Sequence, residues 1–234
     1  MDTKIYGHRG SMGICPQNTL FSFKTAIEQG ADGIEFDVHL SKDGVPMVIH
    51  DETLEGTTNG TGFVKDHTAS DLQSLDAGSG EKIPTLKEVL QLLDGTSVEL
   101  NIELKTIPLL YTGIEEKVLS VVREFGAKRK IVYSSFHLPT LLRLKAADSA
   151  ADIAWLLAFA FPLPHPADCI EALNLEAIHL EVSMFLANPN HYAEVCDKLR
   201  IWTVNNPEDV KTLVNYGVAA IITDYPDRIL SAMQ

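Results

Sequence analysis

Strand-like and helix-like segments alternate along the whole chain, and this alternation limits the possible folds more than any other feature. Eight short runs are apolar, or alternate apolar with polar residues as strands do, and helical spacing follows them. They cover residues 4–8, 33–40, 98–104, 130–136, 152–158, 177–181, 200–205 and 220–224. Eight such repeats predict an α/β fold, a single closed (β/α)₈ barrel. An open doubly wound sheet is disfavoured because no glycine-rich fingerprint follows the first run.

Three of the helical segments have recognisable ends. The first is predicted to begin with Asn18 as its N-cap and to stop at Gly30. The second opens with Thr85 and Glu88, which match a capping box. A cap, a first-position proline and a terminal glycine mark the third, at Asn206, Pro207 and Gly217.

Composition and charge restrict the class of protein. Nothing resembling a linker divides the chain, so we expect one domain over residues 1–234. The net charge of −13 argues against nucleic-acid binding, and an anionic substrate would need local positive charge. Three cysteines without metal-ligand spacing predict neither a disulfide framework nor a zinc site. The N-terminus lacks a signal-peptide core and the run 155–163 is too short to span a bilayer, so we expect a cytoplasmic enzyme without stable membrane insertion.

Acidic residues occupy one face of two predicted strands. In GIEFDVHL, apolar residues alternate with Glu35, Asp37 and His39, and in ELNIELK they alternate with Glu103 and Lys105. The water-facing side of an antiparallel sheet would tolerate such charges. In a barrel, however, the outward face packs on helices and must be apolar. The barrel therefore predicts that these acids point into its interior.

Three carboxylates in one interior would repel each other strongly unless they bound protons or a cation. Oxygen ligands suit a hard divalent ion, Mg²⁺ or Ca²⁺ with Mn²⁺ possible, better than zinc. We therefore predict a metal site at Glu35, Asp37 and Glu103. The alternative is a solvated acidic cluster with salt bridges.

Two histidines are predicted to approach these acids. Asp43-Gly44 between apolar flanks is typical of a two-residue hairpin turn, which would pair Asp37 with His50. His8 ends the first predicted strand, in the sequence GHRG. A single strand-end histidine is usually structural, but a pair beside a metal site indicates function.

The motifs GHRG, PQNT, GADGIEFDVHLSKDGVPMVIHD, ELNIELK, IWTVN and GVAAIITDYP together resemble the glycerophosphodiester phosphodiesterase family over nearly the whole chain. The resemblance implies a TIM barrel that hydrolyses glycerophosphodiesters to glycerol 3-phosphate and an alcohol with a divalent metal. By motif, Glu35, Asp37 and Glu103 match the metal ligands. His8 and His50 match the acid and base, and Arg9 and Lys105 match the phosphate contacts.

One position departs from the family pattern, since Gln17 stands where the family usually has glutamate. The loss of a negative charge would weaken or alter cation binding, unless the amide keeps the same hydrogen bonds, which we favour. Trp202 is a candidate wall for the glycerol or a filler of the barrel mouth. Residues 51–84 are expected to form a long loop over the strand ends that sets specificity.

The remaining polar residues are weaker candidates. Asp51 could orient His50, or it is a turn acid. Glu181 and Asp224 follow predicted strands and are minor candidates for lining the site. The other histidines and Asp66 are expected to be surface or structural residues, namely His67, His137, His165, His179 and His191.

Two other functions remain open on the sequence. A lyase of the phosphatidylinositol phospholipase kind shares a barrel and two histidines, but it would accumulate a cyclic phosphate. A barrel that binds phosphate esters without turnover is the second alternative, for which Gln17 is the only indication.

Overall fold

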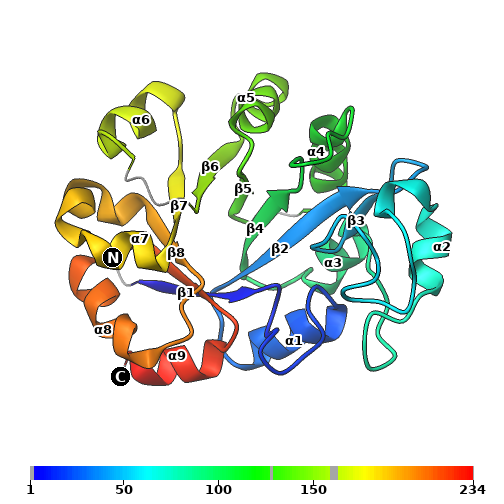
Figure 1. Cartoon of the computed structure of the whole chain (residues 1–234), viewed down its shortest axis with the longest axis horizontal. Helices are drawn as coiled ribbons and strands as arrows, with labels where there is room; N and C mark the ends of the chain where they lie inside the picture. Colours follow the sequence, from blue (N-terminus) through cyan, green and yellow to red (C-terminus); the bar gives the residue numbers. More distant parts are fainter. Residues whose placement is uncertain (1–2, 127–128, 159–162, 234) are drawn as a thin grey trace.

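The computed structural model describes residues 3–126, 129–158 and 163–233, and its parallel strands form a closed eight-membered ring surrounded by helices (Figure 1). This confirms the predicted TIM barrel. The ring consists of β1 (Lys4–His8), β2 (Gly33–Leu40), β4 (Glu99–Leu104), β5 (Ile131–Ser135), β6 (Asp152–Leu157), β7 (Ala177–Glu181), β8 (Leu199–Trp202) and β9 (Ala220–Thr223). Strand β1 pairs with both β9 and β2, which closes the ring. Among the described residues, no helix has the length and apolar character needed to traverse a bilayer.

The helices lie outside the ring, and most of them cover its apolar outer face (Figure 1). They are α1 (Leu20–Glu28), α2 (Ala69–Ser74), α3 (Leu86–Leu92), α4 (Ile114–Phe125), α5 (Leu138–Ala147), α6 (Pro166–Leu173), α7 (Val182–Ala187), α8 (Pro207–Tyr216) and α9 (Pro226–Ala232), with 3₁₀ turns η1 (Val64–Asp66) and η2 (Pro189–Lys198). On β2, Ile34, Phe36 and Val38 are completely buried in the main hydrophobic cluster. Phe36 packs against Phe23 of α1, with ring centroids 5.6 Å apart. The polar residues of β2 consequently point into the barrel.

The hairpin after β2 exists, but its predicted register was wrong by one residue. Strand β3 (Pro46–Val48) runs antiparallel to β2 and places Val48 opposite Val38, so the backbone of Ile49, not that of His50, meets Asp37. The cause is a three-residue loop in place of the predicted two-residue turn. Gly44, at φ +80°, occupies the left-handed position that commonly ends such a loop.

Residues 51–84 are more than the predicted long loop. They include η1 and α2, and α2 lies beside β3 (Figure 1). They also contribute to a second hydrophobic cluster. This cluster consists of Met47, Ile49, Leu54, Val64, Ala69, Leu72 and Ile83. Because this segment packs around its own apolar cluster, it is a folded insertion and not an irregular loop.

Helix ends follow the predicted capping chemistry at two of the three sites. Thr85 and Glu88 form the capping box of α3, and Asn206 caps α8. The prediction that Asn18 caps α1 was wrong, because Thr19 accepts the hydrogen bond from the Ser22 N–H. Asn18 has a positive φ of 58°, and its side chain turns toward the barrel interior.

Candidate active site

The sharp turn after β1 delivers His8 and Arg9 to the C-terminal end of the barrel. Gly10 has φ +83°, and an added Cβ would lie 2.6 Å from the carbonyl carbon of Ser22 on α1. The chain can therefore pass this close to α1 only with glycine here. The Ser22 hydroxyl donates to the Arg9 carbonyl, and the Arg9 N–H donates to Glu35 Oε2 at 3.1 Å.

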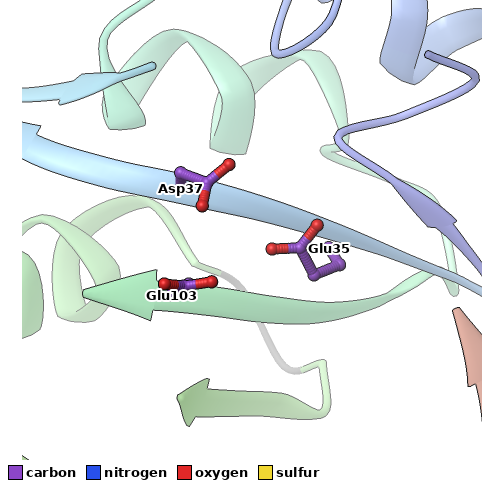
Figure 2. Close-up of side chains that lie close together, drawn as sticks. All are labelled: Glu35, Asp37 and Glu103. Carbon is purple, nitrogen blue, oxygen red and sulfur yellow. The ribbon is translucent and has the colours of Figure 1, made fainter. Parts of the chain in front are cut away.

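Three carboxylates converge at this end of the barrel, on two neighbouring strands. Glu35 and Asp37 extend from β2 and Glu103 from β4, and Figure 2 shows them gathered on the same side of the two strands. One oxygen from each lies within 4.8 Å of the others. All three are buried, with exposed fractions of 5%, 1% and 8%. Parallel pairing places Asp37 opposite Glu103, which explains why residues 66 positions apart meet.

Two cations lie against this acidic cluster. Lys105 Nζ is 3.1 Å from Glu103 and 3.8 Å from Asp37, and Arg9 Nε is 3.4 Å from Asp37. Three carboxylates and two cationic side chains give the cluster a net charge of −1 when all are ionised. This excess negative charge favours binding of an additional cation or a proton.

The pKa values of the acids diverge for identifiable reasons. Burial raises the pKa of Glu35 well above its usual range, and the neighbouring Asp37 and Glu103 carboxylates add to this effect. Burial also raises the pKa of Glu103 to about 7, although Lys105 opposes it. For Asp37, burial is outweighed by Lys105 and Arg9, so its pKa falls to about 2. Without a metal, burial therefore favours the protonated forms of Glu35 and Glu103.

The donor set fits a hard divalent cation. The three ligands are buried carboxylates with oxygens close enough to share one ion, and the raised pKa values of Glu35 and Glu103 mean that a cation would compete with protons there. No cysteine or histidine belongs to this group of the described residues, so its chemistry resembles that of Mg²⁺ or Ca²⁺ sites more than that of zinc sites.

Each of the two histidines is held by an aspartate. His8 Nδ1 lies 2.6 Å from Asp224 Oδ1, and His50 Nδ1 lies 2.6 Å from Asp51 Oδ1. With Nδ1 engaged, Nε2 is the ring atom left for exchange in both cases. His8 Nε2 is 3.9 Å from Glu35, and His50 Nε2 is 3.2 Å from Lys105 Nζ. Burial, reinforced by Lys105 and Arg9, lowers the pKa of His50.

A pocket of about 260 Å³ joins these groups. Its polar side holds His8, Arg9 and His50, together with the carboxylates Glu35 and Glu103. The opposite side is apolar and is formed by Phe136, Leu156, Trp202 and Ile222. Trp202 packs edge-on against Phe136, with centroids 5.7 Å apart. The pocket thus offers charge at one side and an apolar wall at the other.

Gln17 lies beside the cluster and keeps a hydrogen bond there. Its Oε1 accepts from Arg9 Nη1 at 2.5 Å. The neighbouring Asn18 donates from Nδ2 to Asp37 Oδ2 at 2.9 Å. Gln17 therefore supports the guanidinium without adding a charge, and Asn18 supports a carboxylate instead of capping α1.

Two residues of this site were underestimated from the sequence, and two were missed. Asp224 was a minor candidate, yet it contacts His8 directly, and Asp51 was as plausible as a turn acid. Asn205 was missed, although its amide donates to Asp224 Oδ2 at 2.6 Å. Phe136 was missed as part of the apolar wall. Phe136, Asn205 and Asp224 are the last residues of predicted strands, and this position was the available signal.

Comparison with known proteins places this architecture in a family. The model of the glycerophosphoryl diester phosphodiesterase family matches residues 8–228. A glycerophosphodiester phosphodiesterase from Caldanaerobacter subterraneus subsp. tengcongensis is 39% identical, with 100% of this chain and 99% of that protein covered. Another, from Bacillus altitudinis, is 36% identical over 97% of this chain and 96% of the relative.

Solved structures show the same relationship. A phosphodiesterase from Oleispira antarctica, in complex with the product sn-glycerol-3-phosphate, superposes with a TM-score of 0.87 at 30% identity, covering 99% of this chain and 97% of that one. A glycerophosphodiester phosphodiesterase from Agrobacterium tumefaciens gives a TM-score of 0.82 at 29% identity, with 98% and 99% covered. The chain therefore belongs to the glycerophosphodiester phosphodiesterase family and is a phosphoric diester hydrolase.

Proposed function

We propose that the protein hydrolyses glycerophosphodiesters to glycerol 3-phosphate and an alcohol, with a bound divalent cation and two histidines as acid and base. The observation that carries this proposal is the single pocket lined by His8, His50 and two of the three clustered carboxylates. The similar enzyme from Oleispira antarctica, with sn-glycerol-3-phosphate bound, supports this product.

Glu35, Asp37 and Glu103 are the ligands that we propose for Mg²⁺ or Ca²⁺, with Mn²⁺ as a third hard candidate. When bound, the cation supplies positive charge that stabilises the non-bridging phosphate oxygens as negative charge builds on them. The charge balance of the cluster supports this, because a divalent ion would offset its excess carboxylate and the charge of the phosphodiester.

The two histidines would exchange the protons of the reaction through their Nε2 atoms. One imidazole accepts a proton from the attacking oxygen as that oxygen bonds to phosphorus and the P–O bond to the head group breaks. The other donates its proton to the departing alkoxide, so the alcohol leaves neutral. Each transfer is worth about 10²- to 10⁴-fold in rate. Asp224 and Asp51 would hold the Nδ1 protons and so fix which ring atom faces the substrate.

Arg9 and Lys105 are the proposed phosphate contacts, and Trp202 is the proposed wall for the glycerol. Arg9 lines the pocket, and its Nε lies 3.4 Å from Asp37 without forming a hydrogen bond among the described residues. Lys105 Nζ bridges His50 and Glu103, next to where the phosphate would lie. The apolar side around Trp202 and Phe136 suits the carbon backbone of glycerol.

The direct test measures glycerol 3-phosphate released from glycerophosphocholine and glycerophosphoethanolamine. The enzyme is stripped with EDTA and then assayed with Mg²⁺, Ca²⁺ or Mn²⁺ restored. We expect activity to disappear on stripping and return with one of these ions. Phosphorus NMR of the products discriminates the alternatives, since an accumulating cyclic phosphate would indicate a lyase. No turnover with any ion would indicate a barrel that only binds phosphate esters.

The histidine pair is tested by His8→Ala and His50→Ala. We expect each variant to keep its fold and lose turnover by about 10²-fold or more, because one proton transfer is removed. His67→Ala is the matched control, because that ring lies outside the pocket and bonds the Thr61 carbonyl. Its activity should equal that of the parent protein. Full activity in either of the first two variants would refute their proposed roles.

A further inference from the structure

A second pocket lies at the end of the barrel opposite the candidate active site. Its lining comes from the N-terminal ends of the strands, including Lys4 of β1, Glu99 of β4 and Arg200 of β8. Its volume of about 590 Å³ exceeds that of the pocket around His8 and His50. The proposed hydrolysis uses none of these residues.

Arg200 is the unusual member of this lining. It is only 6% exposed, and its guanidinium carbon lies 5.1 Å from the centroid of the Tyr6 ring. Within residues 3–126, 129–158 and 163–233, its Nη1 is completely buried without a hydrogen-bond partner, and Arg200 forms no ion pair. Buried arginine is normally paired, because an uncompensated buried charge is strongly destabilising.

Two of the four acids of the pocket are already paired with other residues of its lining. Glu99 accepts hydrogen bonds from both Lys4 and the Tyr6 hydroxyl. Glu176 is paired with Lys130 at 2.7 Å and with a second lysine at 3.8 Å. The two remaining acids, Asp32 and Asp197, are exposed to water. The lining therefore carries four basic and four acidic residues, but among the described residues none of these acids forms an ion pair with Arg200.

The interior above Arg200 supplies no counter-charge either. His179 of β7 is adjacent in register and fully buried, and its Nε2 has no partner among the described residues. Beyond it, the Nδ2 of Asn101 is 3.5 Å from His179 Nδ1. Barrel interiors are usually filled by branched apolar side chains. Here the residues next to the guanidinium, toward the middle of the barrel, are instead the polar side chains of His179 and Asn101.

We propose that this second pocket is a binding site for a small organic oxyanion, a phosphate monoester or a carboxylate, held by Arg200. The planar guanidinium can donate two parallel hydrogen bonds to such a group, which is the geometry that arginine provides best. Lys198 at the rim adds positive potential at the entrance. The volume leaves room for an organic portion beside the glycine and alanine backbone at 217–220.

The first experiment titrates the intact wild-type protein with inorganic phosphate and, separately, with succinate. The readout is the nitrogen NMR signal of the Arg200 Nε–H group. We expect a saturable shift of this signal with at least one of the two anions, and the anion that acts at lower concentration identifies the ligand class. Phosphate can also enter the pocket of Arg9, but that arginine has its own signal. An Arg200 signal that moves with neither anion, or only as it does with sodium chloride, would overturn the proposal.

The second experiment compares Arg200→Gln with Lys198→Gln by titration calorimetry with the anion identified above. Both variants remove one positive charge from the same pocket, but Lys198 is exposed and already lies near Glu176. We expect Arg200→Gln to weaken binding at this site by at least about tenfold, because charged hydrogen bonds are lost. Lys198→Gln should change it by about threefold or less. Equal effects would show a general charge effect and refute the role of Arg200. Should Arg200→Gln fail to fold, the wild-type titration decides alone.

Discussion

At the scale of single residues, the candidate active site consists of two histidines that are each oriented by a carboxylate. The two pairs are not equivalent. The Asp224 side chain is 18% exposed and is also held by Asn205, whereas that of Asp51 is 39% exposed and neighbours its histidine in sequence. A more buried and better supported carboxylate fixes an imidazole more strictly.

Asp224→Asn should therefore lower kcat by about 10²- to 10⁴-fold with little change in KM. The amide can donate a hydrogen bond to Nδ1, which would stabilise the tautomer with the proton on Nε2 and so block that atom as a proton acceptor. Steady-state kinetics over a range of pH is the measurement, and circular dichroism checks the fold. The pH profile should change shape, which a merely structural defect would not cause.

Asp51→Asn is the comparison, because it makes the same chemical change at the other histidine. Its effect should be smaller, since water reaches Asp51 and can replace part of its hydrogen bonding. A larger loss in Asp51→Asn than in Asp224→Asn would contradict this ranking. Equal kinetics of the parent protein and Asp224→Asn would show that the 2.6 Å contact has no positioning role.

At the scale of elements, the turn from β1 to α1 requires glycine at position 10. Gly10→Ala would place a methyl group 2.6 and 2.7 Å from the carbonyl carbon and oxygen of Ser22, at φ +83°. We expect a loss of roughly 3 kcal/mol or more in the free energy of unfolding, from strain and overpacking together. Activity should fall as well, because Arg9 and His8 precede this glycine. Urea denaturation and turnover measure the two effects.

Gly80→Ala is the matched control for Gly10→Ala. Gly80 has nearly the same backbone angle, φ +84°, but an added Cβ would meet nothing within 4 Å. This variant should lose about 1 kcal/mol from the left-handed conformation alone, and its activity should be unchanged. If the two variants were equally destabilised, close packing on Ser22 would not explain the requirement at Gly10.

The elements themselves could be predicted from sequence because their signals are local. Alternating apolar residues and capping motifs such as Thr85 with Glu88 are defined within a few positions. The register of the hairpin could not be predicted from sequence. It depends on whether the loop holds two residues or three, and Asp43-Gly44 fits both. Asn18 was assigned as a cap because Asn and Thr are both good caps, and only contact with Asp37 distinguishes them.

At the scale of the whole molecule, closure of the barrel creates the site. The acids of β2 and β4 could be predicted to meet, because two neighbouring strands carry them with the same alternation. The contact between His8 and Asp224 joins residues 216 positions apart, and it forms only because β1 and β9 pair to close the ring. No local sequence pattern predicts a contact between residues so far apart in the chain. Strand order had to be known before Asp224 could be given a partner.

Closure of the barrel also buries three carboxyl groups close together. Their pKa values predict how the free energy of unfolding depends on pH when divalent ions are absent. Glu103 has a folded-state pKa of about 7, raised from 4.5 mainly by burial. Between these values the folded protein holds more protons than the unfolded chain, so the free energy of unfolding falls as pH rises. Glu35 acts in the same direction. Asp37, with its pKa of about 2, instead stabilises the fold above pH 4 and loses that effect as pH falls toward 2.

In EDTA, the free energy of unfolding of the wild-type protein should therefore fall, relative to that of Glu103→Gln, as pH rises from about 4.5 to 7. We expect a difference of about 1–3 kcal/mol, measured by urea denaturation at each pH. The contributions of the histidines to the pH dependence cancel in this comparison, because both proteins contain the same histidines. Adding Mg²⁺ or Ca²⁺ should abolish the difference by stabilising the wild type at high pH, because a cation then replaces the protons. A wild-type curve that rises relative to Glu103→Gln over this interval would contradict the buried acidic cluster as the source of the effect.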